Sequence, residues 1–260
     1  MDGKKQQGEP GCFFVSYLIK KGREKTLEGY LLLHGFAGSP ADLQPVAQML
    51  KQEGRLLRCP VLAGHGSGRD RMRTVSWEDW VDSAEGSLIQ LKDVTPRVNV
   101  IGFSLGALIG VMLSQRQRIH RLILLSPPAL PTAQELIQGA TEVARGPLAI
   151  HRRMGSGASI KEYFRRLTRS PVQAIHELYQ LMKAVEPVYG ELDMPVLIIH
   201  GAKDELAHPR GARRVYEQIP SEEKRLVILP HSRHLILKDD EVEQVLKEVR
   251  SFLTPAPSLV

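Results

Sequence analysis

Residues 98–113 constrain the fold of this chain more than any other stretch of similar length. A mostly β-branched run at 98–101 is followed by the pentapeptide GFSLG at 102–106, and a small, apolar, helix-favouring run continues to Leu113. This order predicts a strand, a tight turn and a helix, with Ser104 at the turn. Amide groups at the start of such a helix face any negative charge that develops beside the serine. Taken alone, the stretch fits equally well a glycine-rich turn with an incidental serine.

Strand-like and helix-like stretches alternate along the 260 residues, which predicts a mostly parallel sheet with helices on both faces. The expected strands are 13–19, 29–33, 55–60, 97–103, 121–126, 195–200 and 224–229. The expected helices are 41–53, 76–92, 105–113, 209–218 and 240–252. The second of these helices should begin with Ser76 and Asp79 as a capping pair.

The segment from Ala129 to Leu192 interrupts this alternation, because it has helical character, prolines at 171 and 187 and no clear strand pattern. We expect it to form a helical cap over the strand ends, with its apolar side facing Ser104. The basic residues between 145 and 169 should lie on its outer, solvated face, because an unpaired buried charge is costly. The expected organisation is a core of residues 12–128 and 193–254, a cap at 129–192, and flexible tails at 1–11 and 255–260.

Composition narrows the classes of protein that fit. The formal net charge is +6, but no nucleic-acid motif or interleaved aromatic pattern accompanies it, so no nucleic-acid partner is expected. No apolar run approaches the ~18 residues of a membrane span, and the N-terminal stretch lacks the apolar region of a signal peptide. Cys12 and Cys59 lie in apolar runs without metal-ligand spacing, which indicates two buried thiols and a cytoplasmic protein without a metal site.

Three further motifs follow predicted strands at their carboxyl ends, where ligands bind in open α/β sheets. The first is His34-Gly35-Phe36, directly after the strand at 29–33. A backbone N–H of this loop can point toward the same place as the N–H of Leu105. Two such donors on one oxygen form an oxyanion hole. A plain loop with a structural His34 is the alternative reading of this motif.

The other two motifs deliver an acid and a base. The strand at 195–200 leads to Asp204, and the strand at 224–229 leads to His234. An imidazole can take the proton of a serine, and a carboxylate fixes the tautomer of that imidazole. The chain order Ser104, Asp204, His234 is the order that α/β-hydrolases use. Spacing alone leaves two choices open, because His231 competes with His234 and Glu205 competes with Asp204.

From His34 to Phe252 the chain resembles small bacterial carboxylesterases of the α/β-hydrolase superfamily, close to the monoacylglycerol lipase group. The resemblance is carried by HGFAGSPADLQPVAQML (34–50), PVLAGHG (60–66), WEDW (77–80), GFSLGALIG (102–110), PVLIIHGAKDE (195–205) and HSRHLILKDDE (231–241). It implies Ser104 as nucleophile, Asp204 as acid and His234 as base. It also implies that the N–H groups of Phe36 and Leu105 form the oxyanion hole.

Two departures from the family pattern stand out. Arg233 precedes His234 where these enzymes commonly carry glycine, and a cation beside the base can lower the pKa of the imidazole. The chain also lacks a long HGGG loop, which disfavours bulky esters such as those of tertiary alcohols.

The sequence therefore predicts an α/β-hydrolase fold and a serine carboxylic-ester hydrolase that acts through an acyl-enzyme on short- to medium-chain monoesters. No cofactor is expected, the partner is a small ester, and the chain should be a monomer or weak homo-oligomer without stable membrane insertion. The nearest alternative is a monoacylglycerol lipase. A C–C hydrolase or aminopeptidase of the same fold, or a non-catalytic small-molecule binding protein, are further alternatives.

Overall fold

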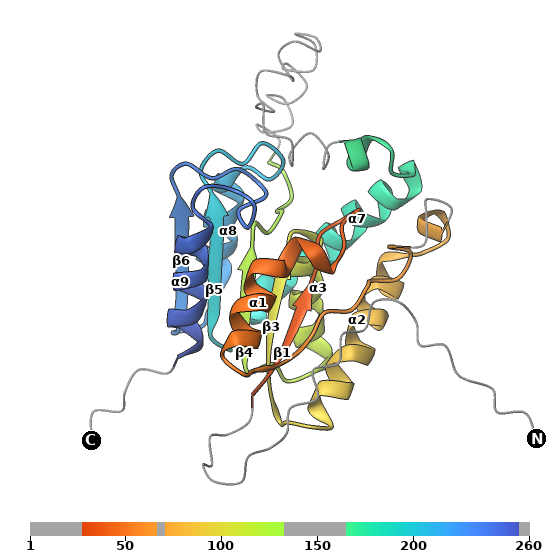
Figure 1. Cartoon of the computed structure of the whole chain (residues 1–260). Coiled ribbons are helices and arrows are strands. Elements are labelled where there is room, and N and C mark those ends of the chain that lie inside the picture. The colour runs from red at the N-terminus through yellow and green to blue at the C-terminus, as the bar shows by residue number, and fades with distance from the viewer. Residues whose placement is uncertain (1–27, 67–70, 133–164, 255–260) are drawn as a thin grey trace, which may run out of the picture.

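The computed structural model describes residues 28–66, 71–132 and 165–254, which contain a six-stranded sheet (Figure 1). All neighbouring strands are parallel, in the order β2-β1-β3-β4-β5-β6. The strands are β1 (Glu28–Leu33), β2 (Leu56–Arg58), β3 (Arg97–Phe103), β4 (Arg121–Leu125), β5 (Val196–Gly201) and β6 (Lys224–Leu229). The predicted parallel α/β architecture is confirmed.

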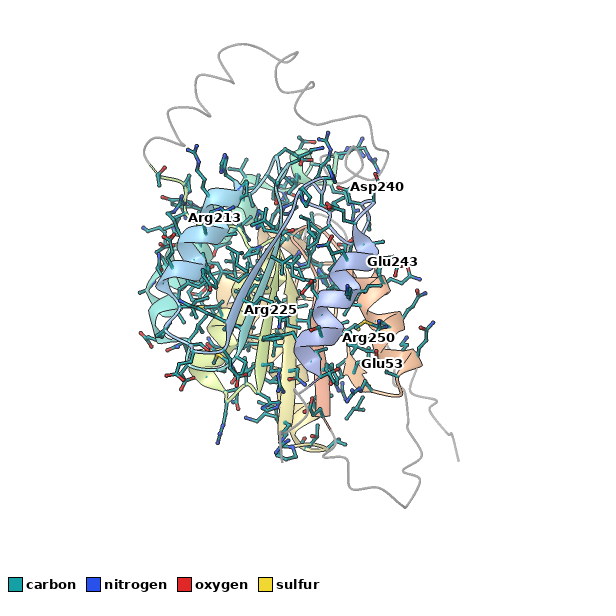
Figure 2. The ribbon with its side chains drawn as sticks, turned by 90° about the vertical axis from the view of Figure 1, so that its left-hand side faces the viewer. Glu53, Arg213, Arg225, Asp240, Glu243 and Arg250 are labelled. Atoms are coloured by element: carbon teal, nitrogen blue, oxygen red, sulfur yellow. The ribbon has the colours of Figure 1, made fainter. Side chains whose placement is uncertain are left out.

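Helices cover both faces of the sheet, so its central strands are buried on both sides and read as continuous apolar runs. One face is covered by α2 (Trp77–Lys92), α3 (Leu105–Arg116) and α8 (Pro209–Gln218), and α7 (Val172–Val185) packs onto α2 and α3 on the same side. The other packs against α1 (Gln44–Gln52) and α9 (Val242–Leu253), which an ion pair joins at the surface. In that pair the Nε of Arg250 donates to Glu53 at 2.8 Å (Figure 2).

Several element boundaries differ from the expected ones. The helix expected at 41–53 begins as a 3-10 turn, Pro40–Leu43, and α1 follows it with Pro45 in its first turn. Proline suits that position because its missing N–H would have no partner inside the helix. The strand expected at 55–60 is only Leu56–Arg58, and the chain turns away ahead of Pro60. Ser76 caps α2 and pairs with Asp79 as expected.

Part of the expected cap can be placed. Helix α7 and the 3-10 helix η3 (Glu186–Glu191) contact α3, and α7 also contacts α2. Leu181, Val185 and Tyr189 from these helices are buried in the core on that face of the sheet. Residues 133–164 of the expected cap lie outside the described residues, so the division into core and cap remains a prediction.

Two other expectations fall partly or wholly outside the described residues. The strand at 13–19 and Cys12 lie outside them. Cys59, just after β2, is only partly buried and packs beside the core formed by α1, α9 and the sheet, so its expected full burial is not met. Within the described ranges, none of the helices has the length and apolar character needed to cross a bilayer.

Candidate active site

The candidate site lies at the carboxyl ends of β1, β3, β5 and β6. Strand β1 lies between β2 and β3, and the chain leaves β1 toward α1 on one face and β3 toward α3 on the other. The loops after β1 and β3 therefore diverge and open a crevice, which is where parallel sheets bind their ligands. The sequence placed Ser104 and Phe36 in these two loops, and both are found there.

Ser104 connects β3 directly to α3 in a strained backbone conformation. Its φ is +52° and its ψ is −112°, a region that side chains other than glycine rarely adopt. The conformation is held from both sides, because the Ser104 N–H donates to the Leu125 carbonyl at 2.9 Å and the Ser104 carbonyl accepts from Ala107 at 3.0 Å. Ser104 is 6% exposed, so the residue is almost fully buried.

The two glycines of the pentapeptide are required by close backbone contacts. A Cβ on Gly102 would clash with the carbonyl of Gly106, and a Cβ on Gly106 would clash with the carbonyl of Leu33. Helix α3 therefore starts in direct backbone contact with β1. This contact sets the position of Ser104 relative to the loop that follows β1.

Gly106→Ala is expected to lower the free energy of unfolding by about 3 kcal/mol, at the upper end of the usual cost of overpacking, because backbone and not a flexible side chain blocks the new methyl group. Gly86→Ala is the matched control, since a Cβ on Gly86 of α2 meets nothing within 4 Å. That variant should gain about 0.5–1 kcal/mol from helix propensity. Urea unfolding measures both, and equal effects of the two changes would contradict the close contact at Gly106.

Ser104, His234 and Asp204 form a continuous hydrogen-bonded chain. The Nε2 of His234 lies 3.1 Å from the Ser104 Oγ, and its Nδ1 lies 2.8 Å from the Asp204 Oδ2. The imidazole is buried and lies against the Phe103 ring, with 5.3 Å between centroids. With the Nδ1 proton directed at the carboxylate, Nε2 carries the lone pair that can accept the serine proton.

The Asp204 carboxylate is satisfied on every side. Its Oδ1 accepts from the N–H groups of Leu206 at 2.9 Å and Ala207 at 2.8 Å. Its Oδ2 lies 3.0 Å from the Nε2 of a second buried histidine, His200. Burial raises the pKa of Asp204, but the charge of His234 and hydrogen bonds from His200 and His234 outweigh it and hold the pKa well below its usual range. His200 is not among the predicted site residues, because its only signal in the sequence is a polar residue at the end of an apolar strand.

The loop that carries His234 is fixed by two tight contacts. The Ser126 hydroxyl, after β4, donates to the His234 carbonyl at 2.9 Å, and Ser126 itself has a φ of +48°. A Cβ on Gly201 would clash with the carbonyls of Ser232 and Arg233. The loops after β5 and β6 can approach each other this closely only because position 201 is glycine.

The geometry distinguishes His234 from His231 and Asp204 from Glu205. His231 is exposed, and its backbone N–H donates to Glu241 at 2.9 Å. The Glu205 carboxylate contacts neither Ser104 nor His234 through a hydrogen bond among the described residues, and burial raises its pKa. The Arg233 cation partly offsets that rise, and the Arg233 N–H donates to Asp239 at 2.7 Å. Of these four residues, His234 and Asp204 belong to the hydrogen-bonded chain that starts at Ser104.

The loop after β1 passes directly beside the serine. A Cβ on Gly35 would lie 3.5 Å from the Ser104 Cβ, and 2.9 Å from the Phe103 ring. Phe36 follows Gly35 in this loop, and Leu105 is the first residue of α3, where the N–H has no partner inside the helix. The two expected oxyanion donors thus lie in backbone segments that flank Ser104.

Two neutral histidines hold this loop in shape. The Nδ1 of His34 donates to the Gly35 carbonyl at 2.9 Å, and its Nε2 accepts from Leu62 at 3.1 Å. The Nε2 of His65 accepts the Ala37 N–H at 3.2 Å, and Ala37 has a φ of +53°. Burial lowers the pKa of His34 to about 4 and also lowers the pKa of His65. Both rings therefore keep the lone pair that accepts a backbone N–H.

The lowered pKa values of His34 and His65 predict that the protein loses stability in mild acid. His34 titrates at 6.5 when unfolded and at about 4 when folded, so the unfolded chain binds more protons between these values. The free energy of unfolding should be highest above pH 6.5 and fall as the pH drops toward 4, by up to about 1.4 kcal/mol per pH unit from His34. Urea unfolding across this window tests the slope, which should be shallower in His34→Gln. The carboxyl of Asp204 does not interfere, because its contribution is lost only below its ordinary pKa of 3.8. An unchanged slope in the variant would contradict this role of His34.

An ion pair between the buried Asp42 and the more exposed Lys238 joins the loop after β1 to the segment after His234. The Nζ of Lys238 lies 2.7 Å from the Asp42 Oδ1, and the Asp42 Oδ2 accepts the Ser39 N–H at 3.2 Å. The two side chains are 196 residues apart in sequence. The proposed oxyanion segment and the histidine segment are therefore joined directly, and not only through the sheet.

The sheet order and the placement of these side chains define the α/β-hydrolase class. The model of the Hydrolase_4 family, described as "Serine aminopeptidase, S33", matches residues 29–241. The chain belongs to this family of hydrolases.

Individual relatives agree with this assignment. The chain is 24% identical over 235 residues to a carboxylesterase of Bacillus subtilis (strain 168), covering 90% of this chain and 94% of that protein. It is 25% identical over 226 residues to a thermostable monoacylglycerol lipase of Bacillus sp. (strain H-257), covering 86% and 89%. The crystal structure of a monoglyceride lipase from Saccharomyces cerevisiae has the same fold, with a TM-score of 0.68 at 19% identity, covering 90% of this chain and 88% of that one.

Proposed function

We propose that this chain hydrolyses carboxylic esters through an acyl-enzyme formed on Ser104. The observation that carries the proposal is the hydrogen-bonded chain from the Ser104 Oγ through the His234 imidazole to the Asp204 carboxylate. A serine hydroxyl is a weak nucleophile by itself, and a base oriented by a third group activates it. The names of the relatives, carboxylesterase and monoacylglycerol lipase, support an ester as the substrate.

In the first half of the reaction, the His234 Nε2 takes the Ser104 proton as the Oγ attacks the ester carbonyl carbon. The negative charge moves to the carbonyl oxygen, where the N–H groups of Phe36 and Leu105 donate to it. Asp204 stabilises the imidazolium that has formed. His234 then gives its proton to the leaving alkoxide, and the alcohol departs from an acylated Ser104.

The second half repeats these roles with water as the nucleophile. His234 takes a proton from the water, the hydroxide attacks the acyl carbon, and the same two N–H groups stabilise the second oxyanion. The proton on His234 passes to the Ser104 Oγ as the carboxylic acid leaves. The steps use groups of the chain, the substrate and water.

Short- to medium-chain monoesters and monoacylglycerols both fit this mechanism, and so does the amide of an N-terminal residue that the family description suggests. A fluorophosphonate probe tests the nucleophile, because it labels only an activated serine, and mass spectrometry of the labelled peptide should identify Ser104. A panel of ethyl esters of increasing acyl length, monoacylglycerols and an aminoacyl amide then ranks the substrates by kcat/KM. Absence of both labelling and ester turnover in the folded protein would refute the proposed function.

A further inference from the structure

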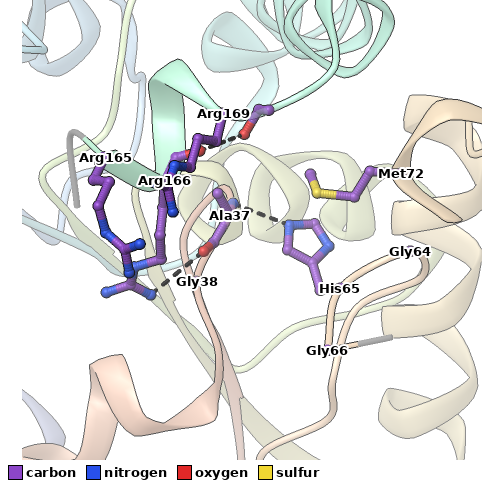
Figure 3. A pocket seen from close by; sticks show the side chains of 10 residues that line it. Ala37, Gly38, Gly64, His65, Gly66, Met72, Arg165, Arg166 and Arg169 are labelled. Carbon is purple, nitrogen blue, oxygen red and sulfur yellow. Dashed lines mark hydrogen bonds between the residues drawn. The ribbon is translucent and has the colours of Figure 1, made fainter. Parts of the chain in front are cut away.

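A cavity of about 210 Å³ lies beside the loop after β1 (Figure 3). Its walls come from that loop, from the loop after β2 and from residues 165–170, which are helical at 165–168. We call it the arginine pocket. The lining side chains that matter here are those of Ala37, His65, Arg165, Arg166 and Arg169.

The arginine pocket is strongly basic. Three of its lining residues are arginines, and none of its lining residues in the described part of the chain is acidic. The Asp42 carboxylate, which lies beside Gly38, is already paired with the Lys238 ammonium at 2.7 Å. Contrary to the expectation of an outer, solvated face, Arg166 is half-buried and its Nη1 lies 3.4 Å from the Ala37 carbonyl. Arg165 and Arg169 are exposed, and Arg152 and Arg153 lie outside the described residues.

The pocket is also close to the reacting centre. Ala37 follows Phe36 in the chain, and Gly35 lies against Ser104. Figure 3 shows Arg165 and Arg166 extending from the helical segment toward the Ala37–Gly38 turn. A group held by these arginines would therefore lie next to the proposed oxyanion segment, within reach of the other end of a bound ester.

Guanidinium groups present a planar set of N–H donors that match the oxygens of carboxylates and phosphates. Glycines 38, 64 and 66 also line the cavity. A small anionic head group fits this combination of size and charge better than an apolar acyl chain does.

We propose that the arginine pocket binds a carboxylate or phosphate group carried by the ester substrate. This inference rests on the proposed function and names a substrate class for the same site: anionic esters, such as the monoester of a dicarboxylic acid or a phosphorylated monoacylglycerol. The carboxylate would enter on the acyl side of the reacting carbonyl and the phosphate on the alcohol side.

Two matched pairs of esters test the proposal. Ethyl hexanoate and monoethyl adipate differ by a carboxylate at the acyl end, and monohexanoylglycerol and its phosphate differ by a phosphate on the alcohol. At low ionic strength, kcat/KM for the charged member of at least one pair should exceed that of its neutral match by about tenfold. Added salt should reduce this ratio because it screens partly exposed charges. The pair that shows the preference identifies the source of the anion.

Substitutions in the arginine pocket test whether its arginines cause the preference for the charged ester. Arg166→Gln/Arg169→Gln, and Arg169→Gln alone, should lower the ratio of charged to neutral kcat/KM, toward one in the double variant. The control is Arg210→Gln/Arg213→Gln, which removes the same charge from exposed positions on α8, where Figure 2 shows Arg213. Using the ratio separates recognition of the anion from any general effect of Arg166 on the loop at Ala37.

The results that would overturn the arginine pocket differ from those that would refute the proposed function. Turnover of the neutral esters without any preference for a charged ester would overturn the proposal that the arginine pocket binds an anion. It would leave the proposed esterase function standing. An equal loss of the ratio in the α8 control would also overturn it, by showing a general effect of net charge. If no ester is hydrolysed, calorimetric titration with inorganic phosphate decides: binding lost only in the Arg166/Arg169 variant supports the pocket, and absence of binding overturns it.

Discussion

Ser104→Ala is expected to reduce kcat for ester hydrolysis by a factor on the order of 10⁶, because the variant has no atom that can form the acyl-enzyme. A residual acceleration over water of roughly 10³-fold should remain, since the two N–H donors and the rest of the site are unchanged. The side chain of Ser104 contacts His234 through one hydrogen bond, and alanine tolerates the backbone as poorly as serine does. The free energy of unfolding should therefore change little.

Initial rates with the best ester of the panel, together with urea unfolding, measure both effects. Ser114→Ala, in the same helix α3, is the matched control: its hydroxyl donates to the Val111 carbonyl at 2.6 Å, away from the sheet end that carries the site. That variant should retain wild-type turnover. Turnover near the wild-type level in Ser104→Ala would refute the proposal that Ser104 is the nucleophile.

His234→Ala is expected to cost about as much as Ser104→Ala, because residues that act in one proton-transfer chain lose their effect together. The same variant should lose labelling by a fluorophosphonate, since Ser104 then has no base within hydrogen-bond distance. His231→Ala should stay within a few-fold of the wild type, because its side chain is exposed and its hydrogen bond to Glu241 is made by the backbone N–H.

The two histidine variants are compared by rate and by labelling in parallel. They are well matched, since the residues are three positions apart and carry the same side chain. A large loss in His231→Ala combined with a small one in His234→Ala would show that the wrong imidazole has been assigned as the base.

Local sequence patterns were sufficient to predict most of the strands and helices and the three polar side chains of the candidate site. Ser104, Asp204 and His234 each follow an apolar run at a strand end, and a parallel sheet gathers such ends at one edge. The choice between His231 and His234 could not be made from spacing, because a loop has no periodicity that says which side chain turns inward. The prediction of His234 as the base came from the family resemblance. In the structure, the His234 ring lies within hydrogen-bond distance of the Ser104 hydroxyl.

The contacts that the sequence did not reveal join residues far apart in the chain. His65 accepts from Ala37 across 28 positions, Lys238 reaches Asp42 across 196, and Arg166 reaches the Ala37 carbonyl across 129. No pattern within an 11- to 18-residue window contains both partners of such a contact. The expectation that the basic residues are solvated failed at Arg166 for this reason, because only the fold brings the loop after β1 to that side chain.

The division of the candidate site between distant strands also has a consequence for when the proposed chemistry could begin. Ser104 and the two proposed amide donors follow β1 and β3, and the Asp204 carboxylate and the His234 imidazole follow β5 and β6. Because a ribosome delivers β1 and β3 first, a growing chain contains Ser104 before it contains the proposed acid and base. In the proposed mechanism, Ser104 would therefore gain its base only after β5 and β6 have joined β4.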